Sequence, residues 1–323
     1  RDRLRSRGLG DVYKRQVLFI AILASLLMGF SFIMKPGKSA KVNALEDPLT
    51  NGILSEKKNT IDVVFLGDSE CYSTFIPLKI WKEHGITSYV CGTSDQVLSF
   101  SYELLIKSMK KQDPKVVVLE TNAIFREVTS TKAFLNKAEG LFSVFKYHDR
   151  WKLMQPKSWR FNEAKTYDRR SKGYLFNMSV SPADAYEYMK PDDSKETISK
   201  DNVKYITKLR DYCKKNNAEL VLVSVPSTKN WNYAKHNAVA ETAKVLGIDY
   251  VDMNTLREEI PINWNTDTRD KGDHLNYFGA VKATEYFGKY LEEKRIFSDK
   301  RKLNEYKDWN STADEFLSSV EKV

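Results

Sequence analysis

The feature that most constrains this chain is a regular alternation of short apolar runs and helix-period segments between residues 61 and 293. The apolar runs, which predict buried strands, lie at 61–66, 88–91, 115–120, 220–225 and 248–251. Apolar residues at helical spacing occupy 96–112, 201–216, 231–246 and 278–293. Strands that alternate with helices join into a parallel sheet covered on both faces. We therefore predict an α/β fold with helices on both sides of a parallel sheet.

A second apolar run lies near the N-terminus. Val17–Met34 holds 18 residues without a charge, preceded by Lys14 and Arg15 and followed by Lys35. About 20 residues cross a hydrocarbon core of ~30 Å, so this run predicts an uncleaved transmembrane anchor. The alternative is a cleaved signal peptide, whose apolar region usually has about 7–15 residues. The basic flank favours the cytoplasmic side, which predicts a single-pass cell-membrane protein with an extracytoplasmic domain.

The charge of the chain is concentrated at its beginning. Residues 1–16 contain six Arg or Lys and two Asp, so they supply four of the nine net positive charges. This segment reads as a cloning or assembly remnant as readily as a natural basic tail. The remaining five charges form no basic stripe interleaved with aromatic residues, and we therefore expect no binding to nucleic acid.

The rest of the chain divides by composition. Residues 35–59 carry scattered proline, glycine and charge, which predicts a linker, and 60–295 form the expected catalytic domain. Residues 296–323 are expected to be a helical tail. Between about 123 and 200 the alternation stops and the segment becomes rich in aromatic and charged residues. An insertion after a strand of an open α/β sheet lies over the ligand crevice, so we expect a cap there.

Four short motifs stand at the ends of predicted strands or just before the last helix. They are Gly67-Asp68-Ser69, Gly92, Asn122 and Asp273-His274-Leu275-Asn276. Read alone, each motif is a turn, a cap or a structural histidine. Together they suit nucleophilic catalysis, because a serine hydroxyl held on a tight turn needs a histidine to remove its proton. Gly67 permits that turn, and we expect Ser69 to be the nucleophile and His274 the base.

In this order, the four motifs resemble the blocks of the SGNH (GDSL-type) hydrolases and acyltransferases. The resemblance covers about 61–294, except for the middle third. It implies a flavodoxin-like three-layer α/β/α sandwich. It also implies an oxyanion hole made of the Ser69 and Gly92 backbone N–H groups and the Asn122 side chain. No metal or organic cofactor is implied.

The carboxylate that orients the histidine departs from the family pattern. The family places an aspartate three residues before the histidine, where this chain has Lys271. The candidates are Asp270, four residues before His274, and Asp273, directly before it. Consecutive side chains tend to diverge, so we favour Asp270 and keep Asp273 as the alternative.

The N-terminal anchor and the altered glycine and asparagine blocks are similar to those of surface-polymer acylation proteins. Examples are the D-alanylation protein of teichoic acid synthesis and the alginate and peptidoglycan O-acetyltransferases, which work with a membrane-bound O-acyltransferase. The resemblance implies that Ser69 accepts an acyl group and passes it to a polysaccharide or teichoic acid hydroxyl, or to water. The alternatives are a stand-alone carbohydrate esterase and a non-catalytic binding subunit of an acylation complex.

Two further groups of residues bear on function. An aromatic and charged cluster in the expected cap could bind substrate through stacking and charge, with a structural cluster as the alternative: His148, Arg150 and Trp151. The three cysteines have no disulfide or zinc spacing and are expected to be small buried residues: Cys71, Cys91 and Cys213.

Overall fold

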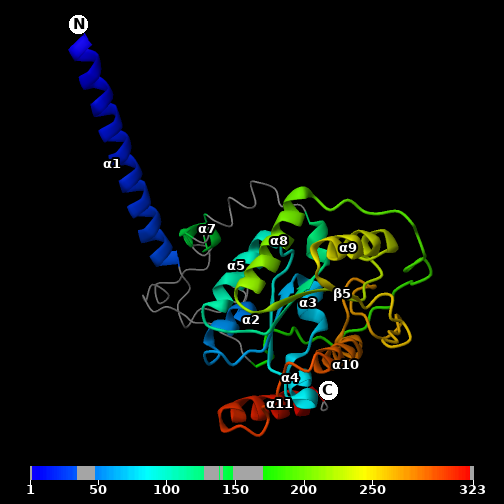
Figure 1. Cartoon of the computed structure of the whole chain (residues 1–323). Coiled ribbons are helices and arrows are strands. Elements are labelled where there is room, and N and C mark those ends of the chain that lie inside the picture. Colours follow the sequence, from blue (N-terminus) through cyan, green and yellow to red (C-terminus); the bar gives the residue numbers. More distant parts are fainter. Residues whose placement is uncertain (1, 35–47, 127–137, 139–140, 148–169, 321–323) are drawn as a thin grey trace. The chain divides into compact units, whose positions relative to one another are not determined.

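The computed structural model describes residues 2–34, 48–126, 138, 141–147 and 170–320. The chain forms two compact units. One consists of residues 1–46 and 129–166, and the other of residues 47–128 and 167–323. The second unit contains the sheet and the residues of the candidate site (Figure 1).

The second unit is built on a five-stranded sheet in which every neighbouring pair is parallel. Its strands, in chain order, are β1 (Val63–Gly67), β2 (Ser88–Gly92), β3 (Val116–Glu120), β4 (Glu219–Ser224) and β5 (Asp249–Asp252). The order across the sheet is β2-β1-β3-β4-β5, the doubly wound, flavodoxin-like order. Strand order reverses between β1 and β3, and ligands of such sheets bind at the carboxyl ends beside this point. The predicted parallel α/β fold is confirmed.

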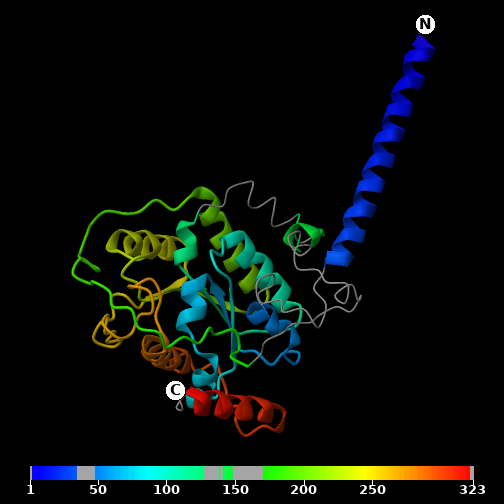
Figure 2. The same ribbon diagram turned by 180° about the vertical axis from the view of Figure 1, so that it is seen from behind.

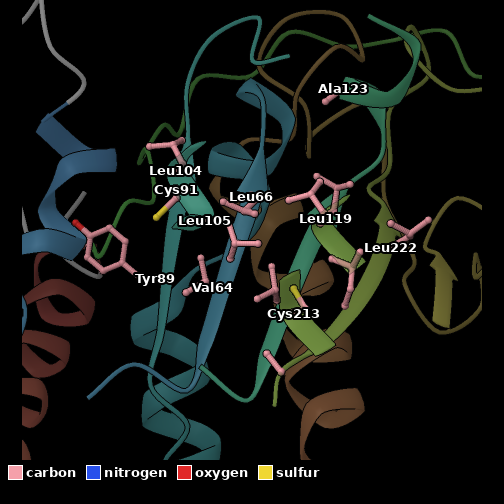
Figure 3. Packing of buried hydrophobic residues seen from close by; sticks show 14 of the residues in the cluster. Val64, Leu66, Tyr89, Cys91, Leu104, Leu105, Leu119, Ala123, Cys213 and Leu222 are labelled. Atoms are coloured by element: carbon pink, nitrogen blue, oxygen red, sulfur yellow. The ribbon is translucent and has the colours of Figure 1, made fainter. Parts of the chain in front are cut away.

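Side chains of the strands alternate between two cores. In β1, Val64 and Leu66 belong to one cluster of buried residues, and Val63 and Phe65 to the other. This period of two follows from strand geometry, and it makes both faces of the sheet apolar. Figure 3 shows the first core, where side chains of three strands meet those of two helices: Val64, Leu66, Leu119, Leu222, Leu104, Leu105 and Cys213.

Helices cover both faces of the sheet (Figures 1 and 2). The first core is closed by α5 (Leu98–Met109), α8 (Lys200–Lys215) and α9 (Tyr233–Leu246). The second is closed by α3 (Ser69–Thr74), α4 (Pro77–His84) and α10 (Tyr277–Glu293). Sequence periodicity did not indicate α3 and α4, because six and eight residues are too few to show a helical period.

Shorter elements complete this unit. Residues in the expected linker form α2 (Pro48–Asn51) and the 3₁₀ turn η1 (Gly52–Ser55), where Ile53 is buried in the first core. A second 3₁₀ turn, η2 (Asn122–Phe125), follows β3. In the expected helical tail, η5 (Asn304–Tyr306) leads into α11 (Lys307–Val320), and Trp309 packs on Trp81 of α4 with ring centroids 5.5 Å apart.

The first unit contains α1 (Asp2–Met34) and α7 (Val144–Tyr147). The backbone N–H of Val144 donates a hydrogen bond to the Ser31 hydroxyl at 3.1 Å. Within α1, Gly10–Met34 is 25 residues long and contains an 18-residue window with a mean hydropathy of 2.6, so it is long and apolar enough to cross a membrane. An anchor and a signal sequence share these properties. Part of the expected cap, including residues 148–169, lies outside the described residues.

Candidate active site

Ser69 stands where β1 turns into α3. Asp68 caps this helix by accepting the Glu70 backbone N–H at 2.9 Å, and Ser69 is the first helical residue. The turn is so tight that a Cβ atom at Gly67 would lie 2.6 Å from the Glu120 Cβ and 2.7 Å from the Cys71 Cβ. Only glycine fits at this position, because the Cβ atoms of Glu120 and Cys71 leave no room for another side chain.

Gly92 and Asn122 both lie against the same turn. Gly92 ends β2 opposite Gly67, and a Cβ there would lie 3.1 Å from the Asp68 carbonyl oxygen. The Asn122 side chain, at the start of η2, donates a hydrogen bond from Nδ2 to Asp68 Oδ2 at 3.1 Å. Parallel strands end at one edge of the sheet, and the structure therefore brings these three motifs together. Their roles in an oxyanion hole stay predictions.

His274 lies on the segment between β5 and α10 and is paired with Asp270. His274 Nδ1 is 2.5 Å from Asp270 Oδ2, and the other oxygen of this carboxylate accepts the His274 backbone N–H at 2.7 Å. Asp273 Oδ1 is 3.7 Å from the same ring nitrogen. The geometry therefore favours Asp270 over Asp273 as the carboxylate that orients the imidazole.

The other ring nitrogen of His274 has a different environment. Nε2 is buried, and no group in the described part of the chain hydrogen-bonds to it. A neutral imidazole whose Nδ1–H is held by a carboxylate has a lone pair on Nε2. This is the arrangement that a general base requires.

A strained turn brings Asp270 back to His274. Lys271 and Gly272 both adopt positive φ, at 62° and 87°, inside a narrow antiparallel turn that Thr268 and Leu275 close with an isolated bridge. A Cβ at Gly272 would lie 1.8 Å from the Thr228 Oγ1. This turn explains why the orienting carboxylate stands four residues before the histidine.

The histidine loop is tied to the serine helix by a short chain of hydrogen bonds. Arg269 donates from Nη2 to the Ser73 hydroxyl at 2.9 Å, and Ser73 donates to the Ser69 carbonyl oxygen at 2.6 Å. Two segments about 200 residues apart in sequence therefore lie side by side. The structure brings Ser69, His274 and Asp270 into one region at the carboxyl edge of the sheet.

Arg126 is part of this region, and sequence reasoning did not single it out. Its guanidinium donates from Nε at 2.9 Å and from Nη2 at 2.6 Å to Asp68 Oδ2, and from Nη1 to Asp95 at 2.5 Å. Partial burial acts to lower the pKa of Arg126, but the Asp68 carboxylate raises it above its usual value. An arginine at the start of the long insertion was the available sequence signal.

Three buried acids surround the serine turn. Carboxylate oxygens of Asp68, Glu70 and Glu120 all lie within 4.8 Å of one another. Burial, with the charge of Asp68 as the next cause, raises the pKa of both glutamates well above the usual value. Glu120 Oε1 accepts the Asn122 backbone N–H at 2.6 Å, which fixes the start of η2.

These carboxylates have the chemistry of a divalent-cation site, and so do Asp270, Asp273 and His274. In the first group, however, Arg126 and Asn122 already donate hydrogen bonds to Asp68. In the second, His274 Nδ1 is paired with Asp270. Within the described residues, both groups therefore have partners from the chain itself.

The remaining predicted residues are placed as follows. His148, Arg150 and Trp151 lie outside the described residues, so their role in substrate binding stays a prediction. Cys71, Cys91 and Cys213 are all buried, as expected for small apolar residues. Burial raises the pKa of the Cys213 thiol to about 12, which suits a buried apolar residue.

No family model matches the sequence, and no curated protein matches it. Among solved structures, a putative acylhydrolase from Bacteroides fragilis aligns at 11% identity over 79% of this chain and 99% of its own, with a TM-score of 0.39. A GDSL-like lipase from Bacteroides thetaiotaomicron aligns at 13% identity over 76% of this chain and 99% of its own, with a TM-score of 0.37. An acetyl xylan esterase aligns at 15% identity over 73% of this chain and all of its own, with a TM-score of 0.38.

The strand order of the sheet, with the sequence motifs at its carboxyl edge, decides the fold. The second unit has the flavodoxin-like α/β fold that the resemblance implies. Its expected features are present in the second unit: a five-stranded parallel sheet, helices on both faces, a serine at the end of β1 and a histidine before the last core helix. The predicted flavodoxin-like α/β sandwich with a parallel sheet is confirmed.

Proposed function

We propose that this chain is a serine acyl-transfer enzyme that forms an acyl-enzyme on Ser69. His274 removes the Ser69 hydroxyl proton as the oxygen attacks the ester carbonyl carbon, and it returns that proton to the departing alcohol. Water or an acceptor hydroxyl then attacks the acyl-enzyme, with His274 taking and returning a proton again. Asp270 holds the imidazole in the required tautomer throughout.

The observation that carries this proposal is the environment of His274. One ring nitrogen is held by Asp270 at 2.5 Å, while Nε2 is buried and has no hydrogen-bond partner among the described residues. A structural histidine would use both nitrogens, because leaving a buried polar atom unpaired costs about 1–3 kcal/mol. The unpaired Nε2 is explained if this nitrogen accepts the proton of the Ser69 hydroxyl during the reaction.

The developing oxyanion needs donors near Ser69. As these donors we propose the backbone N–H groups of Ser69 and Gly92 and the Asn122 amide, because Gly92 and Asn122 both lie against the adjacent Asp68. Each such donor contributes about 2.7–4 kcal/mol to the transition state. This arrangement supports acyl chemistry without distinguishing transfer from hydrolysis.

For the biological role, we propose an O-acyl group, such as acetyl, on a cell-surface polysaccharide or teichoic acid. The support is the long apolar part of α1, which would hold the second unit at a membrane surface. A membrane-bound O-acyltransferase is then the proposed donor partner. The alternatives remain an esterase without this partner and a binding subunit that retains the shape of the site.

The first test uses the full chain in detergent with p-nitrophenyl acetate. We expect a burst of nitrophenol and an acetyl adduct in the intact mass, both absent in Ser69→Ala and His274→Ala. The exposed Val245→Ala variant on α9 serves as the control, with an unchanged burst. A wild-type chain without burst or adduct would contradict the acyl-enzyme.

The second test separates transfer from hydrolysis. Glycerol is added as an alternative acceptor during steady-state turnover. If the site transfers acyl groups, we expect acetylglycerol and faster nitrophenol release, because the alcohol competes with water for the acyl-enzyme. Free acetate alone, at an unchanged rate, would indicate an esterase.

A further inference from the structure

The loop between β4 and α9 lies between the two halves of the candidate site. Ser227, in this loop, donates through its hydroxyl to the Gly272 carbonyl oxygen at 3.0 Å, and the same hydroxyl accepts the Asn230 backbone N–H at 3.2 Å. Ser227 is fully buried. The loop is therefore packed against the strained turn that carries the histidine.

The Asn230 side chain joins the two halves directly. Its Nδ2 lies 2.5 Å from Glu70 Oε1 and 2.5 Å from Asp273 Oδ1. Glu70 follows Ser69 in α3, and Asp273 precedes His274. A single amide nitrogen thus contacts the direct neighbours of both proposed reacting residues.

We propose that Asn230 is a positioning residue, whose amide sets the separation of Ser69 and His274 by donating one N–H to Glu70 and the other to Asp273. This inference rests on the proposed function. The Asn230 amide nitrogen does not contact substrate in this proposal, since both of its N–H groups donate within the protein.

The chemistry of the two acceptors explains why an amide is needed. Glu70 and Asp273 are both acids, and two carboxyl groups facing each other without a donor repel when ionised. An asparagine amide supplies two N–H donors on one planar nitrogen and adds no charge. An aspartate at the same place has the same shape but offers only acceptors when ionised.

The surroundings make this bridge rigid. Glu70 is 2% exposed, and Asp68 and Glu120 face it within the buried acid cluster. Arg126 in turn binds Asp68 through two N–H donors. Because Glu70 has little room to move, a shift at Asn230 is transmitted to the Asp273–His274 segment.

The test compares Asn230→Ala and Asn230→Asp with wild type, using the full chain in detergent. A control is Asn237→Ala on α9, because Asn237 also donates two hydrogen bonds from Nδ2, to the carbonyl oxygens of Asp192 and Ser194. The Asn230→Asp variant preserves side-chain volume and serves if the alanine variant fails to fold.

The kinetic readouts are kcat and KM for p-nitrophenyl acetate and the rate of Ser69 labelling by a fluorophosphonate, in which the serine oxygen displaces fluoride from phosphorus. We expect both Asn230 variants to lower kcat and the labelling rate by about 10- to 100-fold, because small misplacements have effects of this size. KM should change less than about threefold. Unchanged kcat and labelling in both variants would overturn the proposal.

The structural readout is amide hydrogen exchange. In the Asn230 variants, exchange should become faster in both 69–74 and 269–276, whereas Asn237→Ala should leave both segments unchanged. If wild type shows neither burst nor label, the proposed acyl-enzyme is wrong, and the exchange data still decide whether Asn230 joins the two segments. If exchange became faster only in the β4–α9 loop, the proposal that Asn230 joins these two segments would be wrong.

Discussion

His274 and Asp270 contact each other twice within one turn. The carboxylate accepts the His274 backbone N–H at 2.7 Å and lies 2.5 Å from Nδ1 of the same residue. The two contacts fix both the main chain and the ring, so the direction of Nε2 is set before any substrate binds. Because the imidazole is already oriented, no free energy is needed to orient it during the reaction.

This pairing predicts different effects for the two aspartates next to the histidine. Asp270→Asn should lower kcat by about 10⁴-fold, because an amide at this position favours the wrong imidazole tautomer. Asp273→Asn should lower it by less than about tenfold, since its oxygen can still accept from Asn230. The measurement is kcat for p-nitrophenyl acetate in both variants, and equal losses would contradict the assignment of Asp270.

The strained turn predicts a stability difference between two glycines. Gly272→Ala should lower the free energy of unfolding by about 2–4 kcal/mol, because it combines positive φ with a clash against Thr228. Gly247→Ala is the matched control, since Gly247 has φ of 62° and no atom within 4 Å of the added Cβ. Its cost should be about 1 kcal/mol. Urea denaturation measures both, and similar values would argue against the clash.

The buried acids predict a pH dependence of stability. Burial raises the folded-state pKa of Glu120 above the ordinary 4.5, so the folded chain binds more protons than the unfolded chain above this pH. Stability therefore falls as pH rises from about 4.5 towards the raised pKa, by ~1.4 kcal/mol for each pKa unit.

Replacing this acid by its neutral isostere should remove the effect. Glu120→Gln keeps an oxygen for the Asn122 N–H, and its unfolding free energy should increasingly exceed that of wild type as pH rises above 4.5. The surface variant Glu187→Gln is the control and should follow wild type. Parallel stability curves for wild type and Glu120→Gln would contradict the expected linkage.

A buried ion pair predicts another stability effect. Lys172 Nζ lies 2.8 Å from Glu56 Oε1, with both side chains almost fully buried, and the lysine also stacks over the Trp309 ring at 4.2 Å. Glu56→Gln removes the negative charge that pairs with this buried lysine and should cost about 3 kcal/mol.

The exposed pair of Lys190 and Glu187 provides the comparison, at 2.6 Å. Glu187→Gln should cost less than about 0.5 kcal/mol, because water screens this pair. Thermal unfolding of the two variants is the measurement. Equal shifts in melting temperature would show that burial does not distinguish the pairs.

The apolar part of α1 predicts membrane association. The full chain should fractionate with membranes and resist alkaline carbonate, and its mass should show an intact N-terminus. Leu23→Arg should reduce insertion, since arginine at a helix centre costs about 2.5–3.5 kcal/mol. Val245→Arg, on the exposed surface of α9, should have no effect. A soluble, shortened chain would instead indicate a cleaved signal sequence.

Much of the fold follows from local patterns in the sequence. Continuous apolar runs such as 115–120 predict buried parallel strands, and all five strands begin and end within about two residues of their predicted limits. The motifs at Ser69 and His274 were likewise visible, because each stands beside a strand or helix whose position periodicity determines. The shorter α3 and α4 were not, since their packing against α10 and the sheet, rather than a repeating pattern, stabilises them.

The sequence alone therefore determined the parallel α/β architecture, the apolar N-terminal segment and the residues proposed for nucleophile and base. Only the tertiary structure decided between Asp270 and Asp273, because the positive φ values at Lys271 and Gly272 turn the earlier carboxylate back onto the ring. Only it revealed Asn230, which lies 160 residues from Glu70 and 43 from Asp273. Contacts over such separations depend on the order of the strands in the sheet. That order is determined by tertiary packing, and no local spacing of residues predicts it.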